Sequence, residues 1–510
     1  MHNARFTFEI AHIPITMTVI TDYPAAEEAA VPDRHPRALP MLFLTEMWER
    51  FSYYGMRALL VLYLVNSLHY ERKDALALYG LYTGLVYLTP ILGGYLADRY
   101  LGRRKAILIG GLTMALGHFA MAFEPLLHLA LGLLIIGNGF FKPNISTLLG
   151  SLYREHDPRR DGGFTIFYMG VNLGAFLAPL VAGTLGEKVG WDYGFACAGV
   201  GMLFGLTQFT LGQKKLGDAG LPPGKSRLEM IDWIHIVVIA AAMIPFVYLV
   251  LGIASLVGPT WTSLGGFTQL IVVGIAIALL WFAGRVRGAK KDVEPLTRDD
   301  WHRIAAIFIM GLFVVFFWMG FEQAGGTMSL FADKQTDRLF FGWEIPASYF
   351  QAINPLAIVA LGPLMSMMWT RLDRSRYAIP TPAKMGLGMI ILGLGFIVLA
   401  IADANTTGGA KVGPQWLFFV FLIHTVGELF LSPIGLSMVT KLAPTRLAAM
   451  LMGMWYLANA IANYLAGALE ALLTATQIPL YWFLVGSSVG AGCVLLAITP
   501  LIKKLMHGRG

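Results

Sequence analysis

Five side chains that carry or exchange charge lie in one apolar stretch near the amino terminus: Glu46, Glu49, Arg50, Tyr53 and Arg57. At 100° per residue, these positions fall within about a 100° arc of one helix face. The chemistry available to them is ion pairing that a proton makes or breaks, because protonating a carboxylate removes its charge. A polar seam that only fixes helix packing is the alternative, but packing does not require so many aligned polar side chains.

Other charges are also set inside apolar stretches: Lys142, Glu322 and Glu428. A charged side chain in hydrocarbon costs roughly 2.5–3.5 kcal/mol even on the mildest insertion scale. The seven charged groups, if unpaired, would together cost on the order of 20 kcal/mol, which exceeds the ~5–15 kcal/mol stability of a typical fold. We therefore expect these charges to face one another across a polar region.

The composition is that of a polytopic membrane protein. Of 510 residues, 56% are hydrophobic and 14% are charged, whereas soluble domains carry about 25% charged residues. The net charge of +7 does not indicate nucleic-acid binding, because the basic residues cluster between apolar stretches. Cys197 and Cys493 lie in apolar stretches without metal-ligand spacing, and we expect no disulfide.

Fourteen stretches are long and apolar enough to cross a membrane as helices. They are residues 39–68, 75–98, 104–122, 127–151, 163–186, 193–212, 231–252, 263–284, 302–326, 345–369, 384–402, 415–439, 446–473 and 479–501. The segments between them alternate between strongly basic and nearly free of Lys and Arg. The positive-inside rule then places the basic side and both termini in the cytoplasm.

Two basic segments, 213–230 and 285–303, bracket the seventh and eighth stretches, which contain no polar residue of functional type. We interpret those stretches as an inserted pair between two six-helix halves. The predicted units are a cytoplasmic extension (1–38), a first bundle (39–212), a linker with the inserted pair (213–300), a second bundle (301–502) and a cytoplasmic tail (503–510). Residues 1–36 do not form a good signal peptide, and Met17 is an alternative start; a regulatory tail is the other interpretation.

This layout fits the major facilitator architecture, in which two parallel halves rock around a central site. The segment Gly94-Tyr-Leu-Ala-Asp98-Arg99-Tyr-Leu-Gly102-Arg103-Arg104-Lys105 resembles the hallmark loop of that superfamily. Asp98 can join ion pairs that gate the cytoplasmic face. The fold class that we expect is an all-α membrane protein with fourteen transmembrane helices.

The first charged stretch, Glu46-x-x-Glu49-Arg50-Phe-x-Tyr53-Tyr54-Gly55, resembles the first-helix motif of the proton-dependent oligopeptide transporter family, in its bacterial di- and tripeptide branch. Six further segments resemble that family in the same order: Gly139-Phe-Phe-Lys142-Pro143-Asn144, Phe167-Tyr168-Met-Gly-Val-Asn172-Leu-Gly174, Phe317-Trp318-Met-Gly-Phe321-Glu322-Gln323, Phe350-Gln351-Ala-Ile-Asn354-Pro355, Gly427-Glu428-Leu-Phe-Leu-Ser432-Pro433 and Met452-Gly453-Met-Trp455-Tyr456. The resemblance covers roughly residues 40–500.

The resemblance implies proton-coupled symport of di- and tripeptides. Proton coupling would rest on Glu46, Glu49, Arg50, Lys142, Arg57 and Glu322. The resemblance pairs Lys142 with the first-helix cluster, and Arg57 with Glu322 across the two halves. Arg57 and Lys142 would hold the peptide carboxylate and Glu428 its ammonium. Snorkelling of Lys142 and a structural pair of Glu322 with Gln323 are the alternatives.

Further peptide-binding residues follow from the same resemblance: Asn172, Asn354, Tyr53, Tyr54, Tyr87, Tyr168, Trp318, Trp455 and Ser432. The amides would bind peptide backbone, and the aromatic rings would line side-chain pockets. Interhelical hydrogen bonding and ordinary packing are the alternatives for these two groups. Mammalian members carry a histidine in their second helix, but the stretch 75–98 has none. Proton coupling would therefore rest on carboxylates.

Other functions are less well supported by the residues. A membrane-embedded enzyme would need a nucleophile–base pair, a metal cluster or a catalytic loop, and we find none of their motifs. A carrier of the same family for another small anionic or zwitterionic substrate, and a peptide sensor without transport, remain open. Expected partners are peptides, protons and lipid but not nucleic acid, with no cofactor and a functional monomer in a bacterial inner membrane.

Overall fold

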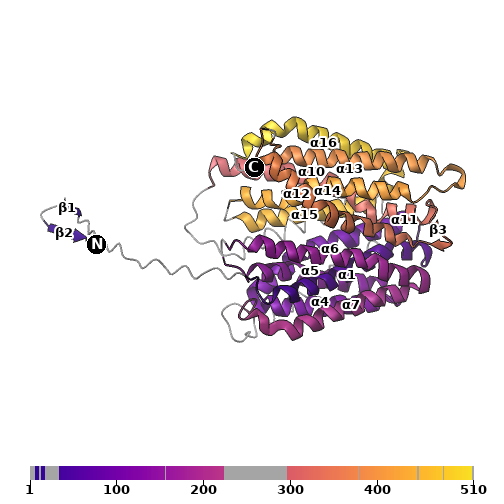
Figure 1. Cartoon of the computed structure of the whole chain (residues 1–510), viewed down its shortest axis with the longest axis horizontal. Coiled ribbons are helices and arrows are strands. Elements are labelled where there is room, and N and C mark those ends of the chain that lie inside the picture. Colours follow the sequence, from indigo (N-terminus) through magenta and orange to yellow (C-terminus); the bar gives the residue numbers. More distant parts are fainter. Residues whose placement is uncertain are drawn as a thin grey trace.

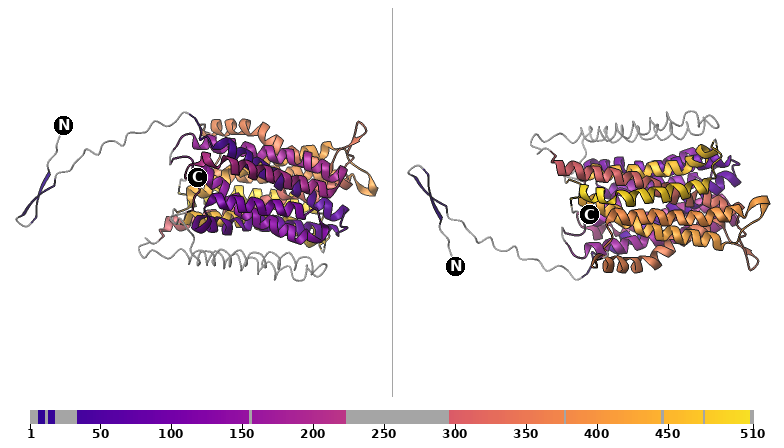
Figure 2. Two further views of the ribbon diagram at one scale, coloured as in Figure 1. Left: turned by 90° about the horizontal axis from the view of Figure 1, so that it is seen from below. Right: turned by 90° about the horizontal axis from the view of Figure 1, so that it is seen from above.

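The computed structural model describes residues 6–10, 13–17, 34–154, 157–222, 296–376, 378–444, 447–474 and 476–507. Long helices that run nearly parallel to one another dominate this part of the chain (Figures 1 and 2). They fall into two groups that lie side by side, one from each half of the sequence.

The first group comprises α1 (Leu39–Asn66), α2 (Arg72–Leu88), α3 (Pro90–Leu96), α4 (Arg103–Ala120), α5 (Leu127–Gly150), α6 (Arg160–Thr184) and α7 (Trp191–Gly212). Short helical turns flank them: η1 (Ala97–Leu101), η2 (Glu124–Leu126), η3 (Leu185–Val189) and η4 (Gln213–Leu216). Pro90 opens α3, and because proline lacks an amide N–H, the α2 hydrogen-bond ladder is interrupted there.

The second group comprises α10 (Arg298–Phe321), α11 (Thr327–Lys334), α12 (Ile353–Asp373), α13 (Thr381–Ala404), α14 (Gln415–Leu442), α15 (Ala448–Thr474) and α16 (Leu480–Leu505). Its short elements are η6 (Glu322–Gly325), η7 (Ala347–Ala352), η8 (Thr407–Gly409) and the hairpin of β3 (Leu339–Phe340) with β4 (Trp343–Glu344). At the start of α10, Thr297 and Asp300 form a reciprocal capping box, which satisfies amides that would otherwise lack partners.

Twelve of the predicted stretches coincide with long helices of the described residues. Nine helical segments there meet a strict length and hydropathy test for membrane spans; α1 does not, because Glu46, Glu49, Arg50 and Arg57 interrupt it. The predicted pair 231–252 and 263–284 lies outside the described residues, so the count of fourteen stays a prediction, as do the proposed unit boundaries. Within the predicted extension 1–38, β1 (Phe6–Ile10) pairs antiparallel with β2 (Ile13–Met17).

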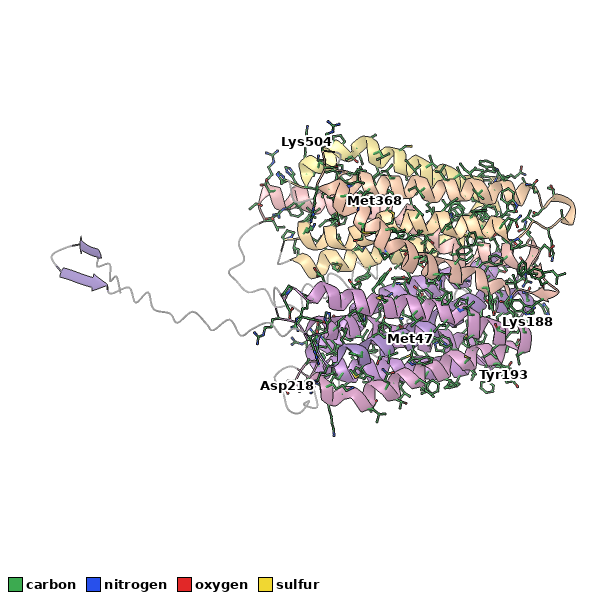
Figure 3. All side chains as sticks on the ribbon, viewed as in Figure 1. Met47, Lys188, Tyr193, Asp218, Met368 and Lys504 are labelled. Atoms are coloured by element: carbon green, nitrogen blue, oxygen red, sulfur yellow. The ribbon has the colours of Figure 1, made fainter. Side chains whose placement is uncertain are left out.

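The helix bundle has two distinct ends. Asp218 and Lys504 lie at one end, and Lys188 and Tyr193 lie at the other (Figure 3). The first is the end predicted to be cytoplasmic, and we call it the basic end. The second, which carries α11, β3 and β4, we call the outer end. Described polar contacts between the two groups of helices concentrate toward the outer end, among them Arg72 with Glu470 at 2.8 Å and Asn66 with Asp333 at 2.9 Å.

Glycines allow α2 and α15 to touch across the two groups. A Cβ on Gly80 would lie 2.7 Å from the Cα atom of Gly467, and a Cβ on Gly467 would lie 2.2 Å from the carbonyl oxygen of Leu76. Small residues give transmembrane helices this kind of close backbone approach.

We expect Gly80→Ala to destabilise the protein by about 1–3 kcal/mol, because the methyl group meets backbone atoms that cannot move aside cheaply. Gly311→Ala is the matched control, since a Cβ there meets nothing within 4 Å. It should leave stability unchanged or raise it, because alanine favours the helix. Thermal unfolding of both variants in one detergent measures the difference; equal melting temperatures would refute the close-packing explanation.

Candidate functional site

The charged face of α1 forms a compact buried cluster. The Arg50 Nε atom lies 3.0 Å from Glu46 Oε1, and the guanidinium also pairs with Glu49. Asn138 of α5 donates a hydrogen bond of 3.3 Å to Glu49 Oε1. Both carboxylates and the guanidinium are at most 5% exposed. The cluster thus balances two acids against one base within a single helix, and the adjacent helix supplies a neutral donor.

Glycines allow the neighbouring helices to pack closely around this cluster. A Cβ on Gly174 of α6 would lie 2.2 Å from the carbonyl oxygen of Met47, and one on Gly139 of α5 would lie 2.8 Å from Thr89. Both glycines belong to segments that carry the family resemblance. Glycine at these two positions lets α6 approach the backbone of α1 and lets α5 approach the α2–α3 junction.

Lys142 of α5 has no acidic partner in the part of the chain that the structure describes. Its Nζ atom sits 4.1 Å from the centroid of the Tyr87 ring, which is a cation–π contact. Among the described residues, no carboxylate lies within 4.0 Å of it. The implied pairing of Lys142 with Glu46 or Glu49 is therefore not formed in this conformation. Pairing elsewhere in a transport cycle stays a prediction.

Arg57 and Glu322 join the two groups of helices. Arg57 Nη2 donates to Glu322 Oε2 at 2.5 Å, and Arg57 Nε donates to the Tyr79 hydroxyl at 2.7 Å. The guanidinium also lies 5.7 Å from the Tyr54 ring centroid. Glu322 sits where α10 passes into η6. The geometry matches the pairing that the resemblance implies, and Gln323 instead donates to the carbonyl oxygens of Met319 and Ala466.

Glu428 of α14 is a buried carboxylate that accepts a hydrogen bond of 2.8 Å from Asn354 Nδ2. Asn354 also donates to Thr425 Oγ1 at 3.0 Å. In the described part of the chain, no cation lies within 4.0 Å of Glu428. Lys142 and Glu428 are thus buried or half-buried opposite charges, on different groups of helices, that lack an ion-pair partner within that part.

The remaining predicted residues lie on the same helices but differ in exposure. Tyr53 packs edge-on against Tyr54 with ring centroids 5.2 Å apart. Asn172 is 5% exposed and donates to the Tyr168 carbonyl one turn earlier, whereas Tyr168 itself is 48% exposed. Trp455 is buried, and Trp318 and Ser432 are half-buried. Their predicted contacts with peptide stay predictions.

Several contributors were not singled out from the sequence. Tyr79 and Asn138 supply the hydrogen bonds to Arg57 and Glu49 from neighbouring helices. A polar residue at mid-span was the available signal for Asn138. Nothing in the sequence distinguishes Tyr79 from the other tyrosines of its helix.

A second ion network lies at the outer end and connects the two groups of helices. Arg338, 9% exposed, pairs with Asp333 at 2.9 Å, with Glu344 at 3.1 Å and with Glu187 at 3.6 Å. Glu187 also accepts hydrogen bonds from the backbone amides of Ala347 and Ser348. In the outer loop, the hydrogen bond from Lys188 and then the charge of Arg338 lower the pKa of Glu344. This carboxylate therefore stays ionised at neutral pH, and the network joins the two groups of helices at the outer end.

We expect Arg338→Gln to loosen the outer end, because the substitution leaves three carboxylates close together without their shared cation. The reporter is a cysteine at Ser348, which is fully buried, in a chain whose Cys197 and Cys493 are replaced by serine. A membrane-impermeant maleimide should label this cysteine several-fold faster in the variant. Lys73→Gln is the control, because this outer-end lysine pairs with Glu71 and not with the network. Unchanged labelling would show that the network does not close this end.

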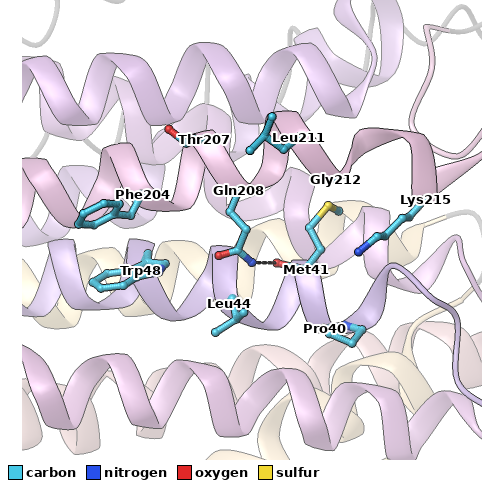
Figure 4. Close-up of a pocket in the computed structure, with 10 residues that line it drawn as sticks. All are labelled: Pro40, Met41, Leu44, Trp48, Phe204, Thr207, Gln208, Leu211, Gly212 and Lys215. Carbon is cyan, nitrogen blue, oxygen red and sulfur yellow. Dashed lines mark hydrogen bonds between the residues drawn. The ribbon is translucent and has the colours of Figure 1, made fainter.

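A groove on the described surface lies apart from this site. It is a groove of about 600 Å³ between α1 and α7 near the basic end, lined mainly by Met41, Leu44, Trp48, Phe204 and Leu211 with Lys215 at one end (Figure 4). Gln208 donates to the Met41 carbonyl at 3.3 Å within it. Its apolar lining fits a surface that lipid covers.

Two bundles of membrane-spanning helices with buried ion pairs between them define a multi-pass membrane transporter. The model of the POT family (PTR2) matches residues 104–483. The chain belongs to the POT family, a family of the major facilitator superfamily.

Similar proteins support the same assignment. The chain is 38% identical to the uncharacterized transporter YclF of Bacillus subtilis, over 93% of this chain and 96% of that protein. It is 35% identical to the peptide transporter YePEPT of Yersinia enterocolitica, again over 93% and 96%. A crystal structure of the peptide transporter POT with sulfate matches at a TM-score of 0.79 and 37% identity, over 94% of this chain and 98% of that one. A POT family transporter in complex with 5-aminolevulinic acid matches at 0.79 and 31%, over 92% and 97%.

Proposed function

We propose that this protein is a symporter that couples inward proton movement to the uptake of di- and tripeptides by alternating access. The observation that carries the proposal is a pair of opposite charges, Lys142 on one bundle and Glu428 on the other, neither of which has an ion-pair partner among the described residues. A zwitterionic peptide complements both charges and would draw the bundles together. The peptide transporters among the relatives support the same substrate class.

Glu322 is the proposed proton switch. With Glu322 protonated, its attraction for Arg57 is lost, and the guanidinium is free to join Lys142 on the peptide carboxylate. When Glu322 releases its proton, it recaptures Arg57 and the carboxylate leaves. The 2.5 Å pair between Arg57 and Glu322 fits the state after proton release.

The α1 cluster is the proposed second coupling element. Protonating Glu46 or Glu49 would leave Arg50 with one acidic partner instead of two. The cluster would then repel Lys142 more strongly, which favours the movement of Lys142 toward a peptide carboxylate. In this way one proton bound by the α1 cluster would make Lys142 available to the peptide carboxylate.

The contacts that join the two bundles at the outer end support an inward-facing conformation. Arg338, Arg72 and Asn66 all join the two bundles there. The positive-inside rule supports placing the basic end and both termini in the cytoplasm of a bacterial inner membrane. We further propose that the protein works as a monomer without a cofactor, with protons as the coupling ion, and that it is not an enzyme.

A carrier for another small zwitterion is the second candidate, and one observation favours it. The structural relatives include a POT family transporter in complex with 5-aminolevulinic acid, a molecule with an amine and a carboxylate. Lys142 and Glu428 would suit such a ligand as well. A peptide sensor without transport is a third possibility, but the complete set of buried charges favours coupling.

Uptake of labelled dialanine by proteoliposomes tests the proposal, with and without an inward proton gradient. We expect accumulation that needs the gradient and collapses when a proton carrier is added. Competition by unlabelled dialanine and by 5-aminolevulinic acid separates the first two candidates. Dialanine binding without uptake would favour a sensor. If neither binding nor uptake occurs in the full chain or after removal of residues 1–36, the proposal is wrong.

A further inference from the structure

Three side chains with metal-binding atoms converge at the basic end of the second bundle, away from the charges of the transport site. His302 Nδ1 lies 3.0 Å from His507 Nε2, and His507 Nε2 lies 3.6 Å from Asp299 Oδ1. All three donor atoms lie within 4.8 Å of one another. We propose that Asp299, His302 and His507 form a binding site for a Zn²⁺-like transition-metal ion.

Local structure brings these residues together. Asp299 and His302 are three residues apart at the start of α10, so both project from the same side of the helix. His507 follows α16 with φ of 49°, in the left-handed region, and its ring lies parallel to that of His302 with the ring centroids 5.2 Å apart. The packing of α10 against α16 fixes the distance between the two segments.

The donor set selects the class of metal. Imidazole nitrogen and carboxylate oxygen suit Zn²⁺, Co²⁺ and Ni²⁺, whereas Mg²⁺ and Ca²⁺ prefer oxygen alone. Ligands about 2.05 Å from a tetrahedral Zn²⁺ lie about 3.3 Å apart. The distances of 3.0 and 3.6 Å from His507 Nε2 to its two neighbours bracket that value. Water would supply the fourth ligand, because Asp299 is 64% and His507 is 36% exposed.

The site would stabilise one bundle and would not control access to the transport site. Its ligands come from α10 and from the end of α16, which belong to one bundle and would move together during alternating access. A bound ion would tie the start of the helix that carries Glu322 to the carboxyl-terminal segment. We therefore expect metal to raise stability while leaving coupled uptake unchanged.

Co²⁺ titration of the full-length, tag-free protein tests the site directly. Coordination by imidazole should give visible Co²⁺ absorption bands, and His302→Ala and His507→Ala should each weaken the apparent affinity by at least about tenfold. Zn²⁺ should displace Co²⁺ and raise the melting temperature, whereas Mg²⁺ should not. His69→Ala, at an exposed outer-end histidine, is the control and should keep both responses.

Retained dialanine uptake in the His507→Ala protein would show that loss of the metal response does not reflect misfolding. If the protein gives no Co²⁺ bands, or if both histidine variants keep them, the cluster is a hydrogen-bonded His–His–Asp group only. If the bands appear but Zn²⁺ leaves the melting temperature unchanged, the stabilising role is overturned.

Discussion

Glu322→Gln is expected to abolish proton-driven accumulation of dialanine while leaving peptide exchange across the membrane. Glutamine keeps the size and hydrogen-bonding ability of the side chain but cannot ionise. The variant therefore cannot recapture Arg57 as the 2.5 Å pair does here. Binding and conformational exchange would continue, because they need a free Arg57 and not the proton itself. Gradient-driven accumulation should fall to the level reached without a gradient.

Two assays on the same vesicles separate coupling from folding. Counterflow, in which unlabelled peptide inside drives labelled peptide inward, should persist in Glu322→Gln. Glu71→Gln is the matched control, because Glu71 pairs with Lys73 at 2.7 Å at an exposed position. It should keep both activities. Undiminished accumulation in the Glu322 variant would remove this residue from the coupling mechanism.

Glu428→Gln is expected to weaken dialanine binding by about 30-fold or more. A buried carboxylate that accepts from Asn354 and lacks a cation in the described structure is suited to a ligand ammonium. Removing one partner of a buried charge pair costs about 2–5 kcal/mol, of which 2 kcal/mol corresponds to the 30-fold loss. The effect should appear in KM more than in the maximal rate.

A ligand without an amino-terminal charge provides the control. N-acetyl-dialanine should bind weakly to the parent protein and no more weakly to Glu428→Gln, because the interaction is already absent. Asn354→Ala should cause a smaller loss with dialanine, since it removes the hydrogen bond that orients the carboxylate and leaves its charge. An equal loss for dialanine and its acetylated form would argue that Glu428 does not bind the ammonium.

Much of the helical framework could be predicted from the sequence, because hydrocarbon forces long apolar segments into helices. The observed helix boundaries differ from the predicted ones where polar residues extend a helix beyond its apolar stretch. For example, the stretch predicted to begin at 302 is a helix from Arg298, because Thr297 and Asp300 cap it. The break of the second stretch at Pro90 was not predicted, although proline there is the physical cause.

The charged residues of the site could be predicted, because an ion in hydrocarbon requires a partner or a function. The partners of these residues could not be predicted from the sequence, because they depend on which helix faces meet in the folded protein. The resemblance implied that Arg57 meets Glu322, but it gave no indication that Tyr79 donates to the same guanidinium. For Lys142 the resemblance implied a partner in the α1 cluster. The described partner of Lys142 is instead the Tyr87 ring.

The most direct test of symport is the reciprocal flux, in which a peptide gradient drives protons. Proteoliposomes with a pH-sensitive dye inside, and no imposed pH difference, receive an inward dialanine gradient while valinomycin and potassium hold the membrane potential at zero. We expect acidification of the lumen by the parent protein and none by Glu322→Gln. Dialanine entry by the parent protein without acidification would contradict proton-coupled symport.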